Sequence, residues 1–182
     1  MLYNSFKVVK MPLTAPSTTL TLEQIREIAR NINHLGAKLY FILLAETGSR
    51  PGALLKLKLN NIDLDSRIIK FYEVEGLSSR TKHAWISFFS KATAKFIRDI
   101  YLLFRDKWVE TWKKSIRALG YSDEFIDEWK CKLLPFKGVH FRNEIYKASE
   151  KVLGKKISLY DLRRFHATYL SVTSSSYRYS AR

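Results

Sequence analysis

Arg50 has surroundings that suit phosphate binding. It lies between Gly48-Ser49 and Pro51-Gly52 in the stretch TGSRPGALLKLKLNNID. A proline directly after the arginine predicts that Arg50 lies at the N-terminus of a short helix. Backbone N–H groups, the helix dipole and a guanidinium would then converge on one phosphate. An arginine that closes a loop and contacts only solvent is an equal alternative for this stretch alone.

A second basic group, Arg80 and Lys82, lies in the stretch SSRTKH. The flanking runs 67–76 and 82–90 are rich in β-branched and aromatic residues, which predicts two strands joined by a polar turn. The two cations would lie at or beside the hairpin tip, where they can contact a nucleic-acid backbone. The more common role for such a turn is to keep the protein soluble.

The third group lies near the end of the chain, in SLYDLRRFHATYL. Tyr160, Arg163 and His166 recur every three residues, so they can share one face of a helix. Arg164 adds a second cation next to Arg163. Taken alone, the stretch is also typical of a basic surface helix that contains one partly buried histidine.

The elements that must position these groups are mostly helices. Thr21 and Gln24 fit a capping box, Gly48 fits a helix C-terminus, and Ser158 with Asp161 fits the start of the last helix. Helices before and after one hairpin predict a mainly α fold with a small antiparallel sheet (α+β). We expect an N-terminal arm, one domain and a disordered Ser-rich tail, at residues 1–20, 21–173 and 174–182. The other expected helices span 36–48, 91–119, 122–133 and 140–154, the second with an apolar stripe of Phe96, Ile100, Leu103, Trp108 and Trp112.

The charge of the chain narrows the possible partners. Thirty-two Lys and Arg against 17 Asp and Glu give a formal net charge of +15 over 182 residues. Such an excess favours a polyanion, most often nucleic acid. Solubility in a crowded or saline host, or an acidic protein partner, are the alternatives.

The single cysteine, Cys131, fits a reducing compartment, and no Cys/His pair has metal-ligand spacing. Without a signal peptide or a membrane-length apolar window, we expect a cytoplasmic protein with no membrane partner.

Taken together, the three groups resemble the catalytic domain of tyrosine recombinases, the phage-integrase family. TGSRPGALLKLKLNNID is similar to the family's first box, in which Arg50 matches the first catalytic arginine. The hairpin with RTKHAWI resembles the unit that carries a catalytic lysine, for which Lys82 is the first choice and Arg80 the second. YDLRRFHATYL resembles the second box, in which Arg163 matches the second arginine and Tyr160 takes the place of a histidine. These variants are most similar to the integrases of archaea and their viruses.

The resemblance implies cleavage and rejoining of double-stranded DNA through a 3′-phosphotyrosyl intermediate. Two arginines stabilise the charge on the phosphate oxygens in the transition state, and a lysine protonates the departing 5′-oxygen. The chemistry needs no metal or other cofactor. Arg80, Arg164 and His166 are further candidates for binding DNA phosphates.

The sequence departs from the family pattern in four respects. A phenol at Tyr160 is a poor base at neutral pH, and the acid expected three residues after Arg50 is Ala53. Only 19 residues follow Arg163, so we expect a catalytic domain truncated before its nucleophile, with Tyr177 and Tyr179 as weak candidates. The family usually has a helical core-binding domain before the catalytic one, and here we expect only an arm of about 20 residues there.

These departures leave several functions open. A partial recombinase could bind DNA phosphate and yet fail to cleave alone, or it could associate with itself or receive a tyrosine from a full-length recombinase. A non-catalytic DNA-binding protein that keeps the fold is the main alternative. A basic helical protein with a protein partner is the third hypothesis.

Overall fold

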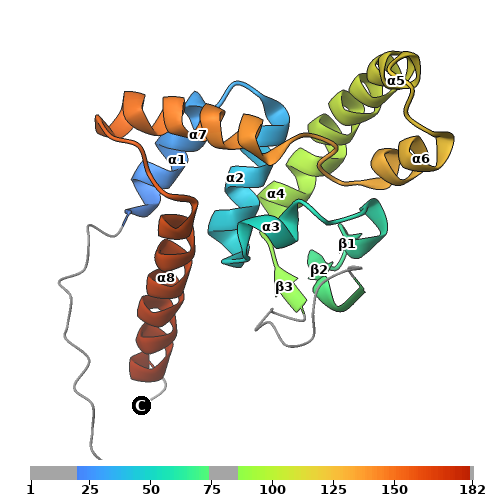
Figure 1. Ribbon diagram of the computed structural model, residues 1–182. Coiled ribbons are helices and arrows are strands. Elements are labelled where there is room, and N and C mark those ends of the chain that lie inside the picture. The colour runs from blue at the N-terminus through green and yellow to red at the C-terminus, as the bar shows by residue number, and fades with distance from the viewer. Residues whose placement is uncertain (1–19, 74–85, 181–182) are drawn as a thin grey trace, which may run out of the picture.

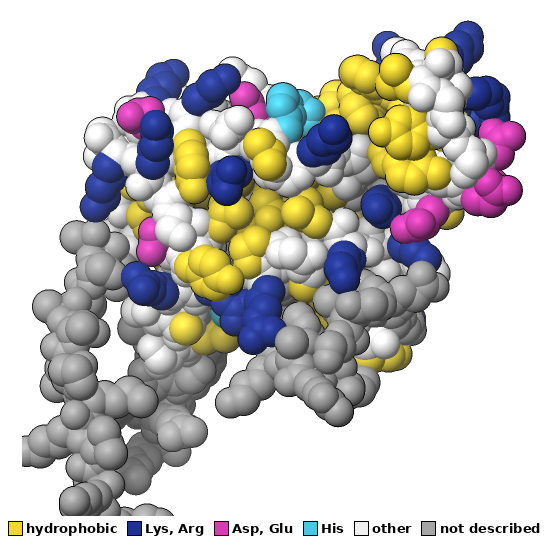
Figure 2. Space-filling model, viewed as in Figure 1, with side chains coloured by type: hydrophobic (Ala, Val, Ile, Leu, Met, Phe, Trp, Pro, Cys, Tyr) yellow, Lys and Arg dark blue, Asp and Glu magenta, His cyan; other side chains and the backbone are white. Residues whose placement is uncertain are grey.

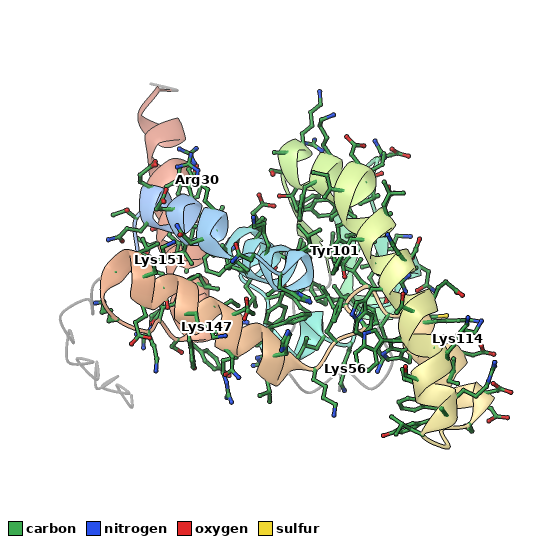
Figure 3. All side chains as sticks on the ribbon, turned by 90° about the horizontal axis from the view of Figure 1, so that it is seen from above. Arg30, Lys56, Tyr101, Lys114, Lys147 and Lys151 are labelled. Atoms are coloured by element: carbon green, nitrogen blue, oxygen red, sulfur yellow. The ribbon has the colours of Figure 1, made fainter. Side chains whose placement is uncertain are left out.

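The computed structural model describes residues 20–73 and 86–180, and these form a mainly helical protein with one small sheet (Figure 1). Four helices, α1, α2, α7 and α8, pack together, while α5 and α6 extend away from them. In the view from above, α5 with Lys114 also runs away from α1 and α7 (Figure 3). The helices are α1 (Leu22–Asn31), α2 (Leu35–Thr47), α3 (Pro51–Leu54), α4 (Lys91–Phe96), α5 (Leu102–Ala118), α6 (Asp123–Cys131), α7 (Gly138–Leu153) and α8 (Leu159–Ser180).

The first two helices begin and end at local signals. The hydroxyl of Thr21 accepts a hydrogen bond from the backbone N–H of Gln24 (3.2 Å), and the Gln24 side chain accepts one from Thr21 (3.0 Å), which confirms the capping box. Gly48 ends α2 with φ +59°, a left-handed conformation that glycine adopts without strain. Helix α2 begins at Leu35, one residue before the predicted start, because His34 caps it by accepting from the N–H of Ala37 (3.1 Å).

The predicted antiparallel pair of strands is confirmed, but both strands are shorter than expected. Strand β2 (Ile68–Lys70) pairs with β3 (Ile86–Phe88), with Ile69 opposite Ser87. Strand β2 ends early because the chain turns into a 3₁₀ helix at Phe71–Glu73. A third strand that the sequence did not predict, β1 (Ile62–Asp63), pairs with the other edge of β2.

The long helix predicted over 91–119 contains a π-helical turn at Ile97–Tyr101, between α4 and α5. This wider turn changes which residues face inward. Ile97, Tyr101, Arg105 and Val109 are buried, whereas three members of the expected apolar stripe are exposed. The predicted stripe is therefore wrong, because an uninterrupted helical period was assumed across the π turn. The exposed members are Ile100, Leu103 and Trp112.

Helix α2 lies at the centre of the core. Its residues Leu39, Phe41 and Leu43 are fully buried, and α7 and α8 both pack against α2, while α1 packs mainly against α7. Helix α8 attaches to the core through Leu162 and Phe165, which are also buried.

The backbone of α8 is helical to Ser180, so this helix includes most of the Ser-rich stretch from residue 174. No glycine or proline interrupts the chain after Ser158, so a helix that has started there can propagate. Its later residues extend beyond the helices that cover its first turns (Figure 1).

Candidate nucleic-acid interface

Arg50 lies in the tight connection between α2 and α3, as the sequence predicted. It is the N-cap residue of α3, and its side chain makes no capping hydrogen bond. The backbone around it is held from inside the protein. The Tyr40 hydroxyl donates to the carbonyl of Pro51 (3.1 Å), and the hydroxyls of Thr47 and Ser49 are hydrogen-bonded to each other (2.7 Å). Because Thr47 and Ser49 are both buried, this network fixes the loop while the guanidinium of Arg50 stays half-exposed.

His166 connects α8 to this same loop. Its Nδ1 lies 3.2 Å from the carbonyl oxygen of Ala45, in the last turn of α2. Its ring covers Gly48 so closely that a Cβ atom on Gly48 would lie 2.4 Å from the ring carbon Cδ2. The glycine is thus required twice, by its left-handed backbone and by the histidine that lies on it.

Arg163 comes one helical turn before His166 and is half-buried. Arg50 follows Gly48 by two residues, so the contact between His166 and Gly48 brings the segments of both arginines to the same end of α2. Lys and Arg side chains gather there on the face seen in Figure 2. Neither Arg50 nor Arg163 forms a side-chain hydrogen bond or ion pair with another residue in the described part of the chain.

The remaining residues of the last stretch are more exposed. Tyr160 is 61% exposed in the first turn of α8. Asp161 accepts from the N–H of Ser158 (2.8 Å), as expected for a capping box, and also contacts Arg164 (3.5 Å). Tyr160 and Arg164 therefore lie on open surface next to the half-buried Arg163.

The environment of His166 favours a neutral ring. Burial lowers the pKa of His166, the hydrogen bond with Ala45 opposes this effect, and the nearby Arg163 guanidinium lowers the pKa further. A neutral imidazole makes contacts with α2 but contributes no charge toward a phosphate. The role of His166 as a phosphate ligand stays a prediction, whereas its observed contacts are with α2.

Glu46 is a residue of this region that the sequence reasoning missed. Its carboxylate accepts hydrogen bonds from the N–H of Ser90 (3.0 Å) and from the hydroxyl of Thr93 (2.9 Å). Ser90 is the N-cap of α4, so Glu46 completes that cap from a different helix. The contact fixes the exit of β3 against the last turn of α2. An acidic residue four positions before Arg50 was the only sequence signal for it.

Four of the candidate residues predicted from the sequence are not placed near Arg50 and Arg163 by the described part of the chain. Arg80 and Lys82 lie outside the described residues. Tyr177 and Tyr179 follow Arg163 by 14 and 16 residues on the backbone of α8. At a rise of 1.5 Å per residue, they lie about 21 and about 24 Å from Arg163 along the helix.

The described residues contain no group of three His, Cys, Asp or Glu side chains that could hold a metal ion. Within the same part of the chain, no helix has both the length and the apolar character needed to span a membrane. Cys131 is an exposed free cysteine at the end of α6.

Comparison with known proteins shows the fold. No protein-family model matches the chain, and no curated protein matches its sequence. Among solved structures, the crystal structure of XerA recombinase superposes with a TM-score of 0.58 at 19% sequence identity. The match covers 84% of this chain and 50% of that chain, so this chain spans about half the length of the recombinase. The mainly helical recombinase fold that the three sequence boxes predicted is thereby confirmed.

Proposed function

We propose that this protein binds double-stranded DNA with the surface at the end of α2, as a site-specific recombinase of the tyrosine recombinase family does. The observation that carries the proposal is the position of Arg50 and Arg163, two half-buried arginines without described hydrogen-bond or ion-pair partners, on either side of the His166–Gly48 contact. The likeness to XerA recombinase supports it. We also infer that its recombinase boxes are of the type found in the integrases of archaea and their viruses.

Each proposed residue has a distinct part. Arg50 and Arg163 donate paired hydrogen bonds to the non-bridging oxygens of one phosphate, whose charge increases in the transition state. Tyr160 donates one hydrogen bond to the same phosphate, in the place of a histidine. Lys82, with Arg80 as the second choice for this role, protonates the departing oxygen.

We propose that the 182-residue chain does not cleave DNA by itself. In-line attack needs a tyrosine hydroxyl within about 3–3.5 Å of the phosphorus. Tyr177 and Tyr179 lie along α8, about 21 and about 24 Å from Arg163 in helix rise. A second polypeptide, either another copy or a full-length recombinase, would have to supply the nucleophile.

The binding part of the proposal can be tested with a labelled DNA duplex and fluorescence anisotropy. Arg50→Ala and Arg163→Ala should each weaken binding about tenfold, because each removes one paired contact to phosphate. Each should also reduce the salt slope of log K by about one. Arg26→Ala is the matched control, since Arg26 is exposed on α1 and pairs with Glu23. Equal losses in all three variants would contradict a specific site.

The cleavage part needs a separate experiment. The purified chain is incubated with a nicked suicide substrate, which traps a phosphotyrosyl adduct. We expect no adduct that survives denaturation with the chain alone. If an adduct forms and is lost in Tyr177→Phe or Tyr179→Phe, the proposal of an incomplete site is wrong, although DNA binding through the arginines would stand.

The same observations support a second function, that of a DNA-binding protein that occupies sites without recombination. Tyr160 favours it, because a phenol binds phosphate but is a poor proton acceptor at neutral pH. Failure to recover cleavage when a tyrosine is supplied by a second protein would favour this alternative.

A further inference from the structure

The arm formed by α5, α6 and the residues between them (102–131) is the most distinctive surface outside the candidate site. It extends away from α1, α7 and α8 in two perpendicular views (Figures 1 and 3). Its two helices pack against each other around Val109 and Ile126, which are 5% and 1% exposed. The arm therefore has a small interior of its own and presents its other faces outward.

One side of the arm is aromatic. The ring of Trp108 lies 5.5 Å from Trp112 and 5.6 Å from Trp129, which joins the two helices. Trp112 is 44% exposed, so this cluster reaches the surface, and Phe125, one turn before Trp129 on α6, is 43% exposed. A broad apolar area covers the arm in Figure 2. Large exposed apolar patches on a protein surface often mark interaction sites.

The direction of the arm is fixed by a buried charge. Arg105 is 3% exposed, and its guanidinium donates to the carbonyls of Lys130 and Lys132, where α6 ends. The Tyr101 hydroxyl donates to the next carbonyl, that of Leu133 (2.6 Å). The aromatic side is thus presented by a rigid support, which lowers the entropic cost of binding a partner.

The charges of the arm differ from those of the rest of the chain. Residues 102–131 contain six basic and six acidic side chains, so the whole excess of +15 lies elsewhere. Within the arm, α5 carries a net charge of +3 and α6 a net charge of −3. A neutral, aromatic surface offers little to a DNA backbone, whose affinity depends on an excess of positive charge.

We propose that the aromatic side of the arm binds the same surface of a second copy of this chain. In a two-fold contact, the net negative α6 of one copy lies against the net positive α5 of the other, and this pairing occurs twice. The +15 excess lies outside the arm, so two copies whose arms meet do so without net repulsion between the contacting surfaces. The contact leaves the basic end of α2 free on both copies.

The outward charges of the two helices allow a decisive test. Glu124 and Glu128 lie one turn apart on α6, and Lys107 and Lys114 lie two turns apart on α5; all four are exposed. The charge reversals are Glu124→Lys with Glu128→Lys in one protein, and Lys107→Glu with Lys114→Glu in another. Sedimentation equilibrium should show the unchanged protein rising from 21.3 kDa toward twice that mass with concentration.

Each reversed protein alone should lose at least tenfold in dimer affinity, and an equimolar mixture should recover it, because opposite charges then meet again. A wild-type chain that stays monomeric would overturn the proposal. The proposal would also be overturned if the charge reversals left the apparent mass in sedimentation equilibrium unchanged, or if the mixture of the two reversed proteins did not recover the dimer.

The apolar part is tested by Trp112→Ser and, because that change could loosen the arm itself, by Leu119→Asp, whose side chain is 72% exposed. Both should weaken the dimer by tenfold or more. Val139→Asp, at a site 59% exposed on α7, is the matched control and should not. DNA affinity measured with dilute protein should be the same in all three variants. A loss of DNA affinity without a change of mass would assign the arm to DNA and overturn the proposal.

Discussion

The end of α2 and the base of the arm both depend on arginine, but they use it in opposite ways. Arg105 is buried, and its donors are taken up by the carbonyls of Lys130 and Lys132. Arg50 and Arg163 are half-exposed, and their donors have no hydrogen-bond or ion-pair partner among the described residues. A guanidinium whose donors are already used holds a structure together. One that the backbone positions but leaves unsatisfied is suited to bind an anion.

The largest effect on this comparison is expected from a substitution of Gly48, the glycine that the His166 ring covers. Gly48→Ala places a Cβ atom in a left-handed residue and against the imidazole ring. We expect a loss of about 3 kcal/mol in unfolding free energy, from backbone strain and overpacking combined. Urea denaturation measures it.

Gly120→Ala is the matched control in the arm. Gly120 has φ +83°, but no atom lies within 4 Å of an added Cβ. It should therefore cost only the backbone term, about 1–2 kcal/mol. Equal losses in the two variants would show that the His166 contact with Gly48 contributes nothing.

The next largest effect is expected at the base of the arm. Arg105→Ala leaves the carbonyls of Lys130 and Lys132 without their charged donor, which should cost about 2 kcal/mol. Hydrogen exchange should become faster in α6 and stay unchanged in α2. Faster exchange in α2 as well would show that the arm and the core are one cooperative unit.

A smaller effect is expected from Glu46→Gln, which keeps the shape of the side chain and removes its charge. The cap of α4 would be weakened, at a cost of about 1 kcal/mol. DNA affinity should also fall, because Glu46 holds the exit of β3 against the last turn of α2, next to the Arg50 loop. Glu27→Gln on α1, where Glu27 pairs with Arg30, is the control for removing one carboxylate.

The smallest effect concerns pH. Burial lowers the pKa of His166 in the folded protein, so the unfolded chain binds more protons between the folded and the unfolded pKa values. The stability that neutral His166 contributes should be fully present above the pKa of His166 in the unfolded chain. It should decrease as the pH falls through that value toward the lower pKa of the folded protein. His166→Gln should reduce this slope in unfolding experiments. His34, whose pKa burial also lowers, accounts for a slope that remains.

The local parts of the fold were predictable because their causes lie within a few residues. The Thr21 capping box and the Gly48 helix end each depend on one turn of chain. The contact between Ala45 and His166 joins residues 121 positions apart, and no local pattern indicates it. The sequence thus predicted that Arg50 and Arg163 act together, but the contact between His166 and Gly48, which brings their segments to the same end of α2, became visible only in three dimensions.

The π turn at Ile97–Tyr101 has a consequence for how this protein can change over time. A π turn accommodates one residue more per turn than an α turn, so it is a place where the helix can take up an extra residue without ending. Each inserted or deleted residue rotates the rest of α5 by about 100° around its axis. A single codon gained or lost there would point the aromatic surface in a new direction while the end of α2 stayed as it is. Related chains could thereby exchange one partner for another without altering the residues proposed to bind DNA.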